Sequence, residues 1–263
     1  MASSDGISFY FFDFDDNIMF LSTSIFVRNT VTGEKKPLST GDYANVHPQL
    51  GNPGDWEDWA EFDGTFSHFR DVRSRPSRKQ HFVQDVEAAI AGEVWKAPSW
   101  DLFVHACEKQ RPVSIVTARG HSPATIKAGV RLLVEKGLLP REPKYHTVFP
   151  VSNEDVRREQ LDDPDLSVTI PVLKKRAIIR SVETALDKFG HEPPHRFGMS
   201  DDDPKNVNLI ISAMCECKKR FLDKRFFVIN THFGQHVKLE VYPVDFPVTG
   251  KPGNVLSQSP PAG

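Results

Sequence analysis

The sequence has few cysteines, little net charge and no long apolar run. Its three cysteines, Cys107, Cys215 and Cys217, match neither a disulfide framework nor a metal-knuckle spacing. The formal net charge of −2 predicts no nonspecific attraction to nucleic acid or to an anionic membrane. Apolar runs fall short of the roughly 18 residues that span a bilayer, and residues 1–6 lack the basic region of a signal peptide. We therefore expect a cytoplasmic protein without membrane association.

The composition is that of a globular protein. With 263 residues, the chain is long enough for one large domain or for one domain with a sizeable insert. Hydrophobic residues make up 39% of the chain and charged residues 26%, both typical of a folded protein. No internal repeat is visible in the sequence.

Predicted strands alternate with predicted helices over most of the chain. Strands are expected at 7–13, 113–117, 195–200, 226–229 and 237–241, with a further apolar segment at 147–151 inside a polar stretch from 138 to 172. Helices are expected at 82–95, 98–109, 122–136, 173–189 and 207–218. This alternation predicts an α/β fold, with a parallel sheet covered by helices on both faces.

The stretch after the first strand interrupts the alternation. A hairpin is expected around residues 24–34, but residues 39–80 show no clean period. We interpret residues 19–95 as an insert over the carboxyl edge of the sheet, and residues 1–18 with 96–247 as the core. The Gly-, Pro- and Ser-rich tail from 248 to 263 is expected to be mobile.

The segment Phe9–Asn17 is the most informative part of the sequence. Four aromatic residues in the first positions lead into three carboxylates, Asp13, Asp15 and Asp16. Unpaired charges are too costly to bury within a strand, so the strand is expected to end at the carboxylates. In an open α/β sheet, ligands bind at the carboxyl ends of the strands. The acidic cluster is therefore a candidate site.

Polar residues also stand at or near the ends of three other predicted elements. Their order along the chain is acid, hydroxyl, lysine, acid: Asp13 and Asp15, then Thr117, then Lys174 and Lys175, then Asp201 and Asp202. Alone, the acids and the threonine are common as turn or cap residues, and the two lysines would be a solvated helix start. The combination, however, matches the requirements of phosphoryl transfer.

Each residue type has a distinct role in that chemistry. Asp13 can attack phosphorus and form an acyl phosphate, while Asp15 can act as general acid and then as general base. Mg²⁺ suits a cluster of carboxylates, and we expect Asp13 to bind it together with Asp201 or Asp202 from another strand end. Thr117 and the adjacent backbone amides can hydrogen-bond a phosphoryl oxygen, and a lysine can offset its charge.

These motifs resemble those of the haloacid dehalogenase (HAD) superfamily of phosphohydrolases. The resemblance covers residues 7–17 and about 98–229. Its first motif corresponds to Phe-Phe-Asp13-Phe-Asp15-Asp16-Asn17, although Asn17 replaces the usual Thr or Val; the second corresponds to Ser114–Gly120. The motif lysine corresponds to Lys174 better than to Lys175, and the acidic motif to Gly198–Asn206, with the metal ligand open between Asp201 and Asp202.

The resemblance implies a Rossmann-like core, a Mg²⁺ cofactor and an aspartyl-phosphate on Asp13. It assigns the acid/base role to Asp15, whose backbone carbonyl is also implied as a metal ligand. The loop with Thr117, Ala118 and Arg119, together with Lys174 or Lys175, is implied to bind the substrate. The insert corresponds to the family's C1 cap, which excludes water and selects the substrate.

Other proteins with similar motifs fit less well. C-halogen hydrolases generally lack the second Asp, ion pumps need membrane spans, and response-regulator receivers place their acidic pair first. A binding protein that keeps the fold without turnover is a remaining alternative. So is a phosphatase for nucleic-acid ends, although the basic stretch His68–His81 is more simply a solvated loop. Small phosphometabolites, nucleotides and phosphoproteins also remain open as substrates, as does the oligomeric state.

Overall fold

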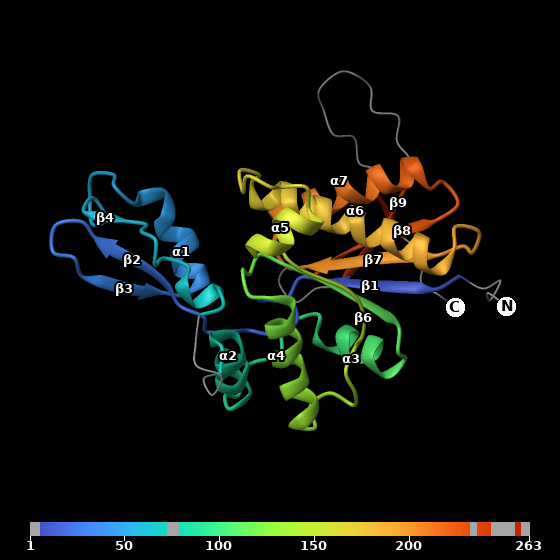
Figure 1. Ribbon diagram of the computed structural model, residues 1–263, viewed down its shortest axis with the longest axis horizontal. Helices are drawn as coiled ribbons and strands as arrows, with labels where there is room; N and C mark the ends of the chain where they lie inside the picture. The colour runs from blue at the N-terminus through green and yellow to red at the C-terminus, as the bar shows by residue number, and fades with distance from the viewer. Residues whose placement is uncertain (1–5, 73–78, 232–235, 243–255, 259–263) are drawn as a thin grey trace, which may run out of the picture.

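A computed structural model describes residues 6–72, 79–231, 236–242 and 256–258. Its main sheet has seven strands, of which five neighbouring strands are parallel (Figure 1). The parallel strands lie in the order β8 (Arg225–Asn230), β7 (Arg196–Asp201), β1 (Ser8–Phe12), β5 (Pro112–Thr117) and β6 (Lys144–Pro150). At the other edge, β9 (Val237–Val241) pairs antiparallel with β8, and β10 (Leu256–Gln258) pairs antiparallel with β9.

Helices cover both faces of this sheet (Figure 1). One face carries α5 (Glu154–Gln160), α6 (Ile170–Phe189) and α7 (Pro204–Arg220), and the other carries α2 (His81–Ile90), α3 (Trp100–Glu108) and α4 (Pro123–Glu135). The fold is therefore α/β with a mostly parallel sheet, as the sequence predicted, and is compatible with a Rossmann-like core.

The aromatic run of β1 divides between the two faces. Side chains alternate along a strand, so Phe9 and Phe11 contact the cluster under α6 and α7, while Tyr10 and Phe12 contact the cluster under α3 and α4. Phe9, Phe11 and Phe12 are at most 1% exposed. Burial of these rings on both faces holds β1 at the centre of the sheet.

The position of β1 defines the functional edge of the sheet. The chain passes from β5 to β6 on one side of β1, and then crosses to β7 on the other side by way of α6. Such a reversal of strand order opens a crevice at the carboxyl ends of the strands, which is where ligands bind in α/β sheets. Asp13 follows β1 at that edge.

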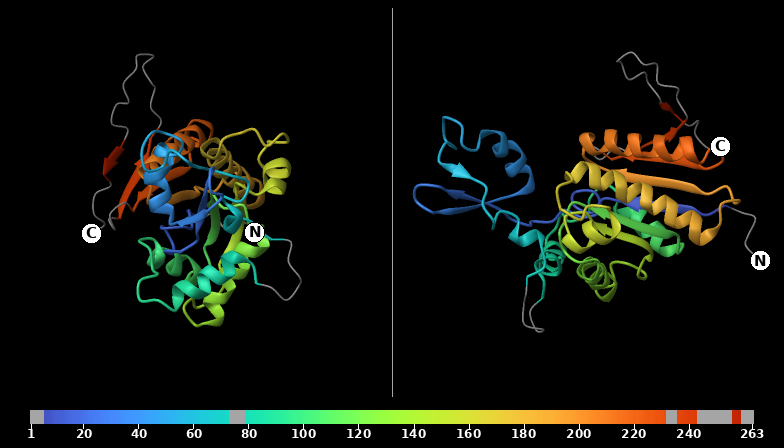
Figure 2. Two further views of the ribbon diagram at one scale, coloured as in Figure 1. Left: turned by 90° about the vertical axis from the view of Figure 1, so that its left-hand side faces the viewer. Right: turned by 45° about the horizontal axis from the view of Figure 1, so that its top comes forward.

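Residues 25–69 form a small lobe that stands apart from the main sheet (Figures 1 and 2). It contains a three-stranded sheet and short helices: β2 (Ile25–Asn29), β3 (Lys35–Leu38), β4 (Trp59–Ala60), α1 (Thr40–Val46), η1 (His47–Gln49) and η2 (Ser67–Phe69). The hairpin expected around residues 24–34 corresponds to β2 and β3, which pair antiparallel.

Helix α2 follows the small lobe but packs on the main sheet. Its buried residues Phe82 and Val86 belong to the same cluster as Phe12, Phe14 and Ile126. The segment 19–95, which the sequence groups as one insert, thus contains a projecting lobe and a helix that packs against α4. The domain boundaries given above stay a prediction.

Several element boundaries differ from the expectation. The helix expected to reach residue 95 ends at Ile90, because Gly92 follows and Trp95 instead stacks edge-on against Trp100. Helix α6 begins at Ile170, three residues early, with a proline in its first turn. Helix α5 lies inside the stretch expected to be a polar loop. Asn153 caps it by accepting a hydrogen bond from the amide of Val156.

The predicted tail falls mostly outside the described residues. Its described part is β10, which extends the sheet. Residues 73–78, within the basic stretch, also lie outside the described residues. Among the described helices, none combines the length and apolar character needed to cross a membrane.

Candidate active site

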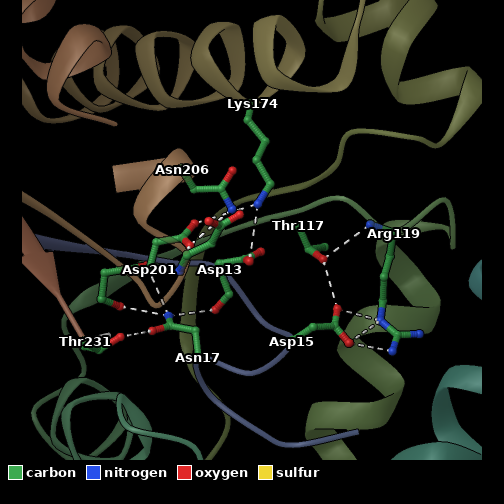
Figure 3. Close-up of polar contacts among 11 residues, drawn as sticks. Asp13, Asp15, Asn17, Thr117, Arg119, Lys174, Asp201, Asn206 and Thr231 are labelled. Carbon is green, nitrogen blue, oxygen red and sulfur yellow. Dashed lines mark hydrogen bonds and ion pairs between the residues drawn. The ribbon is translucent and has the colours of Figure 1, made fainter. Parts of the chain in front are cut away.

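The four polar segments singled out in the sequence meet at the carboxyl edge of the main sheet (Figure 3). Asp13 follows β1, Thr117 ends β5, Asp201 ends β7, and Lys174 lies in the first turns of α6. They converge because parallel strands end on the same edge and α6 starts beside it. The sequence order acid, hydroxyl, lysine, acid therefore becomes one spatial cluster.

The centre of the site is a group of three carboxylates around one lysine. Asp13, Asp201 and Asp202 each place a carboxylate oxygen within 4.8 Å of the others. Nζ of Lys174 lies 3.3 Å from Oδ2 of Asp13 and 3.7 Å from Oδ2 of Asp201. The Lys174 side chain is only 6% exposed and that of Asp201 is 0% exposed, so these charges interact with little screening by water.

Burial shifts the ionisation of the acidic group. It raises the pKa of Asp13 to about 7, against the opposing effect of Lys174. It also raises the pKa of Asp202 to about 7 and raises the pKa of Asp201. Burial opposes the charged form of Lys174, but the carboxylates of Asp13 and Asp201 outweigh it and raise the lysine pKa. The single positive charge of Lys174 is therefore not enough to balance the negative charges of three ionised carboxylates.

The donor set fits a divalent cation. Among the described residues, Oδ1 of Asp13 and Oδ2 of Asp201 are buried without a hydrogen-bond partner. Buried carboxylate oxygens are normally satisfied by hydrogen bonds or by a metal. Oxygen ligands from a few carboxylates are those that Mg²⁺ prefers. Asp13, Asp201 and Asp202 would hold it.

Asn17 forms hydrogen bonds with the backbone that carries this cluster. Its Nδ2 donates to the backbone carbonyls of Asp13 and Ser200, both at 3.1 Å, and to the Ser200 hydroxyl at 3.0 Å. Its Oδ1 accepts from the hydroxyls of Ser99 at 2.8 Å and Thr231 at 3.0 Å. Asn17 is fully buried. The amide thus joins the loop after β1 to β7 and to the residue that follows β8.

Asp15 belongs to a different local network. Its carboxylate is directed toward Arg119, away from Lys174 (Figure 3). Nε of Arg119 donates to both carboxylate oxygens, at 3.1 and 2.9 Å, and Nη2 donates to Oδ1 at 2.6 Å. Thr117 is fully buried, and its hydroxyl lies 3.5 Å from Oδ2 of Asp15. Such two-point pairing fixes the orientation of the carboxylate.

A cavity of about 420 Å³ opens between the sheet edge and the small lobe. Asp13, Asp15 and the loop Thr117–Gly120 line it on the sheet side, and Ile25, Thr40, Phe66 and Phe69 line it on the lobe side. Its volume lies within the range of small-molecule sites. The candidate nucleophile thus lines a space large enough for a ligand of limited size.

The structure places most of the predicted site residues together. Lys174 reaches the acidic cluster, whereas Lys175 pairs with Glu216 at 2.9 Å on the helix surface. Both Asp201 and Asp202 are near Asp13. Ala118 and Arg119 line the cavity. The Asp15 side chain is not in the carboxylate group around Asp13. Its predicted role as a metal ligand thus concerns its backbone carbonyl.

Several site residues were not identified from the sequence. In the sequence, Asn17 stood out only as a departure from the family motif. That departure gave no indication of its buried contacts. Arg70 and Arg157 also line the cavity, although Arg157 pairs with Asp163 at 2.7 Å. Thr23, which accepts a hydrogen bond from Arg119, had no signal at all. These residues become recognisable only when distant segments are brought together.

The fold and site together define an α/β protein with an acidic, lysine-containing crevice at the switch point of a mostly parallel sheet. Comparisons with models of known families, with curated proteins and with solved structures found no match. The function must therefore be inferred from the residues of the site itself.

Proposed function

We propose that the protein is a Mg²⁺-dependent phosphomonoester hydrolase of the HAD superfamily, with Asp13 as nucleophile. The observation that supports this most directly is the buried grouping of Asp13, Asp201 and Asp202 around Lys174 beside a cavity. Three acids and one lysine at the carboxyl edge of a parallel sheet suit the charge of a phosphoryl group and its counterion. A structural ion pair alone would not leave two carboxylate oxygens unsatisfied.

Asp13 would form the covalent intermediate. Its carboxylate attacks the phosphorus of the substrate, the new oxygen–phosphorus bond forms, and the bond to the leaving oxygen breaks. Lys174 stands 3.3 Å from Asp13 and would carry positive charge toward the phosphoryl oxygens. The Thr117 hydroxyl and the amides of the following loop would hydrogen-bond those oxygens.

Asp15 would transfer protons in both half-reactions. As a carboxylic acid it gives its proton to the departing oxygen, so that the alcohol leaves neutral. As a carboxylate it then takes a proton from water, whose oxygen attacks the phosphorus and releases phosphate from Asp13. Its place on the cavity wall supports this role.

A divalent cation would be held by Asp13, Asp201 and Asp202, with the Asp15 carbonyl as a further ligand implied by the family resemblance. When bound, it would neutralise carboxylate charge and polarise a phosphoryl oxygen. Asn206 donates to Oδ1 of Asp201 at 3.2 Å, which orients that carboxylate. Such supporting contacts strengthen ligand placement in metal sites.

The small lobe would act as the C1-type cap. Its residues Thr40, Phe66 and Phe69 face the cavity from the side opposite Asp13. A cavity of about 420 Å³ suits a small phosphorylated compound. In this proposal the lobe contacts the leaving group and limits its size.

The proposal is tested by hydrolysis of p-nitrophenyl phosphate and of a panel of metabolite and oligonucleotide phosphates, with Mg²⁺ and with chelator. Asp13→Asn should lose turnover and phosphoenzyme labelling while keeping the fold, whereas Asp101→Asn, an exposed carboxylate on α3, should remain active. Full activity of Asp13→Asn would refute the mechanism. Metal binding without turnover on any phosphoester would favour the alternative, a binding protein.

A further inference from the structure

Arg119 links Asp15 to segments outside the main sheet. Its side chain is 1% exposed and donates three hydrogen bonds to the Asp15 carboxylate. Nη2 also donates to the hydroxyl of Thr23 at 2.6 Å. That hydroxyl in turn donates to Oδ2 of Asp85 on α2, again at 2.6 Å. A continuous chain of polar contacts therefore runs from Asp15 to the segment that leads into the small lobe.

Two aromatic rings pack against the same guanidinium group. Its central carbon lies 4.8 Å from the ring centre of Phe69, in η2 of the small lobe, and 4.8 Å from that of Phe82, in α2. Both rings attract the cation through their negative faces. The amide of Gly120 donates to the carbonyl of Phe69 at 2.8 Å. Arg119 is thus held by the small lobe as well as by the core.

Packing alone does not explain the buried ion pair between Arg119 and Asp15. A buried ion pair costs so much desolvation that apolar residues of the same volume are often as stabilising. What the arginine adds is orientation, because its planar fork fixes both carboxylate oxygens. Oδ1 accepts from both Nε and Nη2, so these two contacts hold the carboxyl group in place when Oδ2 carries a proton.

We propose that Arg119 is a positioning residue, which fixes Asp15 for proton transfer and makes its position depend on the small lobe through Phe69 and on the segment before that lobe, with α2, through Thr23. The inference rests on the proposed phosphatase function. Proton transfer requires the carboxyl oxygen within hydrogen-bond reach of the leaving oxygen. A misplacement of about 1 Å costs on the order of 100-fold in rate.

Two substrates with different leaving groups test the role of Arg119. p-Nitrophenolate is stable enough to leave with little help from an acid, whereas phenolate depends on protonation. Arg119→Met should therefore lower kcat/KM for phenyl phosphate about tenfold more than for p-nitrophenyl phosphate, within the usual range of general acid catalysis. Arg119→Lys, which keeps the charge without the fork, should show the same selectivity. Equal losses on both esters would overturn the proposal.

A double-mutant cycle separates positioning from a general structural effect. If Arg119 acts through Asp15, Asp15→Asn/Arg119→Met should hydrolyse phenyl phosphate no more slowly than Asp15→Asn alone. Asp15→Asn should also melt at a lower temperature than the double variant, because it leaves a buried cation without its anion. The proposal would be contradicted if the rate losses of the two single variants multiplied in the double variant. Equal melting temperatures of Asp15→Asn and the double variant would also contradict it. Arg131→Met, which removes the exposed pair with Glu142, is the matched control.

Thr23 tests the link to the segment before the small lobe and to α2. Thr23→Val removes the hydroxyl that joins Arg119 to Asp85 but keeps the side-chain volume. It should shift the selectivity between the two esters in the same direction as Arg119→Met, by a smaller factor. Thr23→Ser keeps the hydroxyl and should retain wild-type selectivity. Unchanged selectivity in Thr23→Val would refute the coupling through Thr23.

Measurements on the wild-type protein distinguish failure of the proposed function from failure of the role proposed for Arg119. Absence of turnover and of a phosphoenzyme in the wild type would refute the proposed function, and this inference with it. Wild-type turnover with unaltered ester selectivity in Arg119→Met would refute the inference alone. Should Arg119→Met not fold, Arg119→Lys and Thr23→Val give the same decision. Addition of guanidinium ion to Arg119→Ala should restore turnover of phenyl phosphate.

Discussion

Nζ of Lys174 lies 3.3 Å from the carboxylate of Asp13, in surroundings that are almost dry. The pair joins the first turns of α6 to the end of β1. Asp201 lies 3.7 Å from the same ammonium group. Because Lys174 is the cation nearest to both carboxylates, the stability of the metal-free protein should depend on it strongly.

Lys174→Met should lower the free energy of unfolding of the metal-free protein by about 3 kcal/mol or more, because it leaves buried carboxylates without their counter-charge. Urea denaturation in the presence of a chelator measures this loss. Saturating Mg²⁺ should recover part of it, since the cation would replace the missing positive charge.

Lys175→Met is the matched control for that experiment. Lys175 is the neighbouring residue on α6, and its pair with Glu216 is 33% and 46% exposed at the two side chains. Exposed ion pairs contribute at most about 1 kcal/mol. Comparable losses in the two variants would contradict the central role assigned to Lys174.

Asn17→Ala should destabilise the protein by about 2 to 4 kcal/mol, because the substitution leaves several buried polar groups without partners. The lost contacts connect Asp13 to Ser200 and Ser99 to Thr231. The variant should also have reduced phosphatase activity, since the backbone carbonyl of Asp13 loses its hydrogen bond from Asn17. Thermal and urea unfolding measure the first effect.

Asn52→Ala serves as a comparison for Asn17→Ala. Asn52 is exposed, and its side chain makes one hydrogen bond within the described part of the chain, to the carbonyl of Pro48. Its replacement should change stability by less than about 1 kcal/mol. If Asn17→Ala were equally mild, the amide would not stabilise the site as its contacts indicate.

The parts of the fold with strong local signals could be predicted from the sequence. The aromatic run before Asp13 predicts a buried strand that ends at charges, and β1 ends at Phe12. The apolar spacing between residues 173 and 189 predicts most of α6. Such signals arise because burial imposes a period of two or 3.6 on the sequence. Helix α5, seven residues long, is too short to show that period.

The contacts that organise the site could not be predicted in the same way. Arg119 and Asp15 are 104 positions apart, and Asn17 and Thr231 are 214 apart. No local pattern encodes the direction of a guanidinium or an amide toward such a distant partner. The small lobe was equally difficult to predict, because β3 and β4 contain four and two residues, respectively. Tertiary packing determines both features.

Mg²⁺ should raise the melting temperature of the wild-type protein and should raise that of Asp201→Asn much less. The carboxylate oxygens left unsatisfied at Asp13 and Asp201 are the expected ligands. A ligand at 100 times its dissociation constant stabilises the folded state by about 2.7 kcal/mol. Scanning calorimetry over a Mg²⁺ titration measures the shift. Asp101→Asn should respond like the wild type, and an equal response of Asp201→Asn would contradict the site.

His121 should make the protein sensitive to mild acid. The ring is fully buried, neither nitrogen has a hydrogen-bond partner among the described residues, and burial, with a contribution from Arg119, lowers its pKa from 6.5 to about 4. The unfolded state therefore binds more protons than the folded state between about pH 4 and pH 6.5, so the stability is fully present above pH 6.5 and falls as the pH drops. The loss at pH 5 should be about 2 kcal/mol relative to pH 7.5.

Urea denaturation of the wild type and of His121→Leu at the two pH values isolates this contribution. Leucine does not titrate, so the variant should lose about 2 kcal/mol less than the wild type between pH 7.5 and pH 5. His121→Phe, which preserves a ring against Phe82, separates titration from packing, because the two rings lie 5.6 Å apart in the wild type. Both variants should show the same reduced pH dependence even if their absolute stabilities differ. A wild-type pH dependence in both variants would contradict this assignment, because groups other than His121 would then cause the loss of stability between pH 7.5 and pH 5.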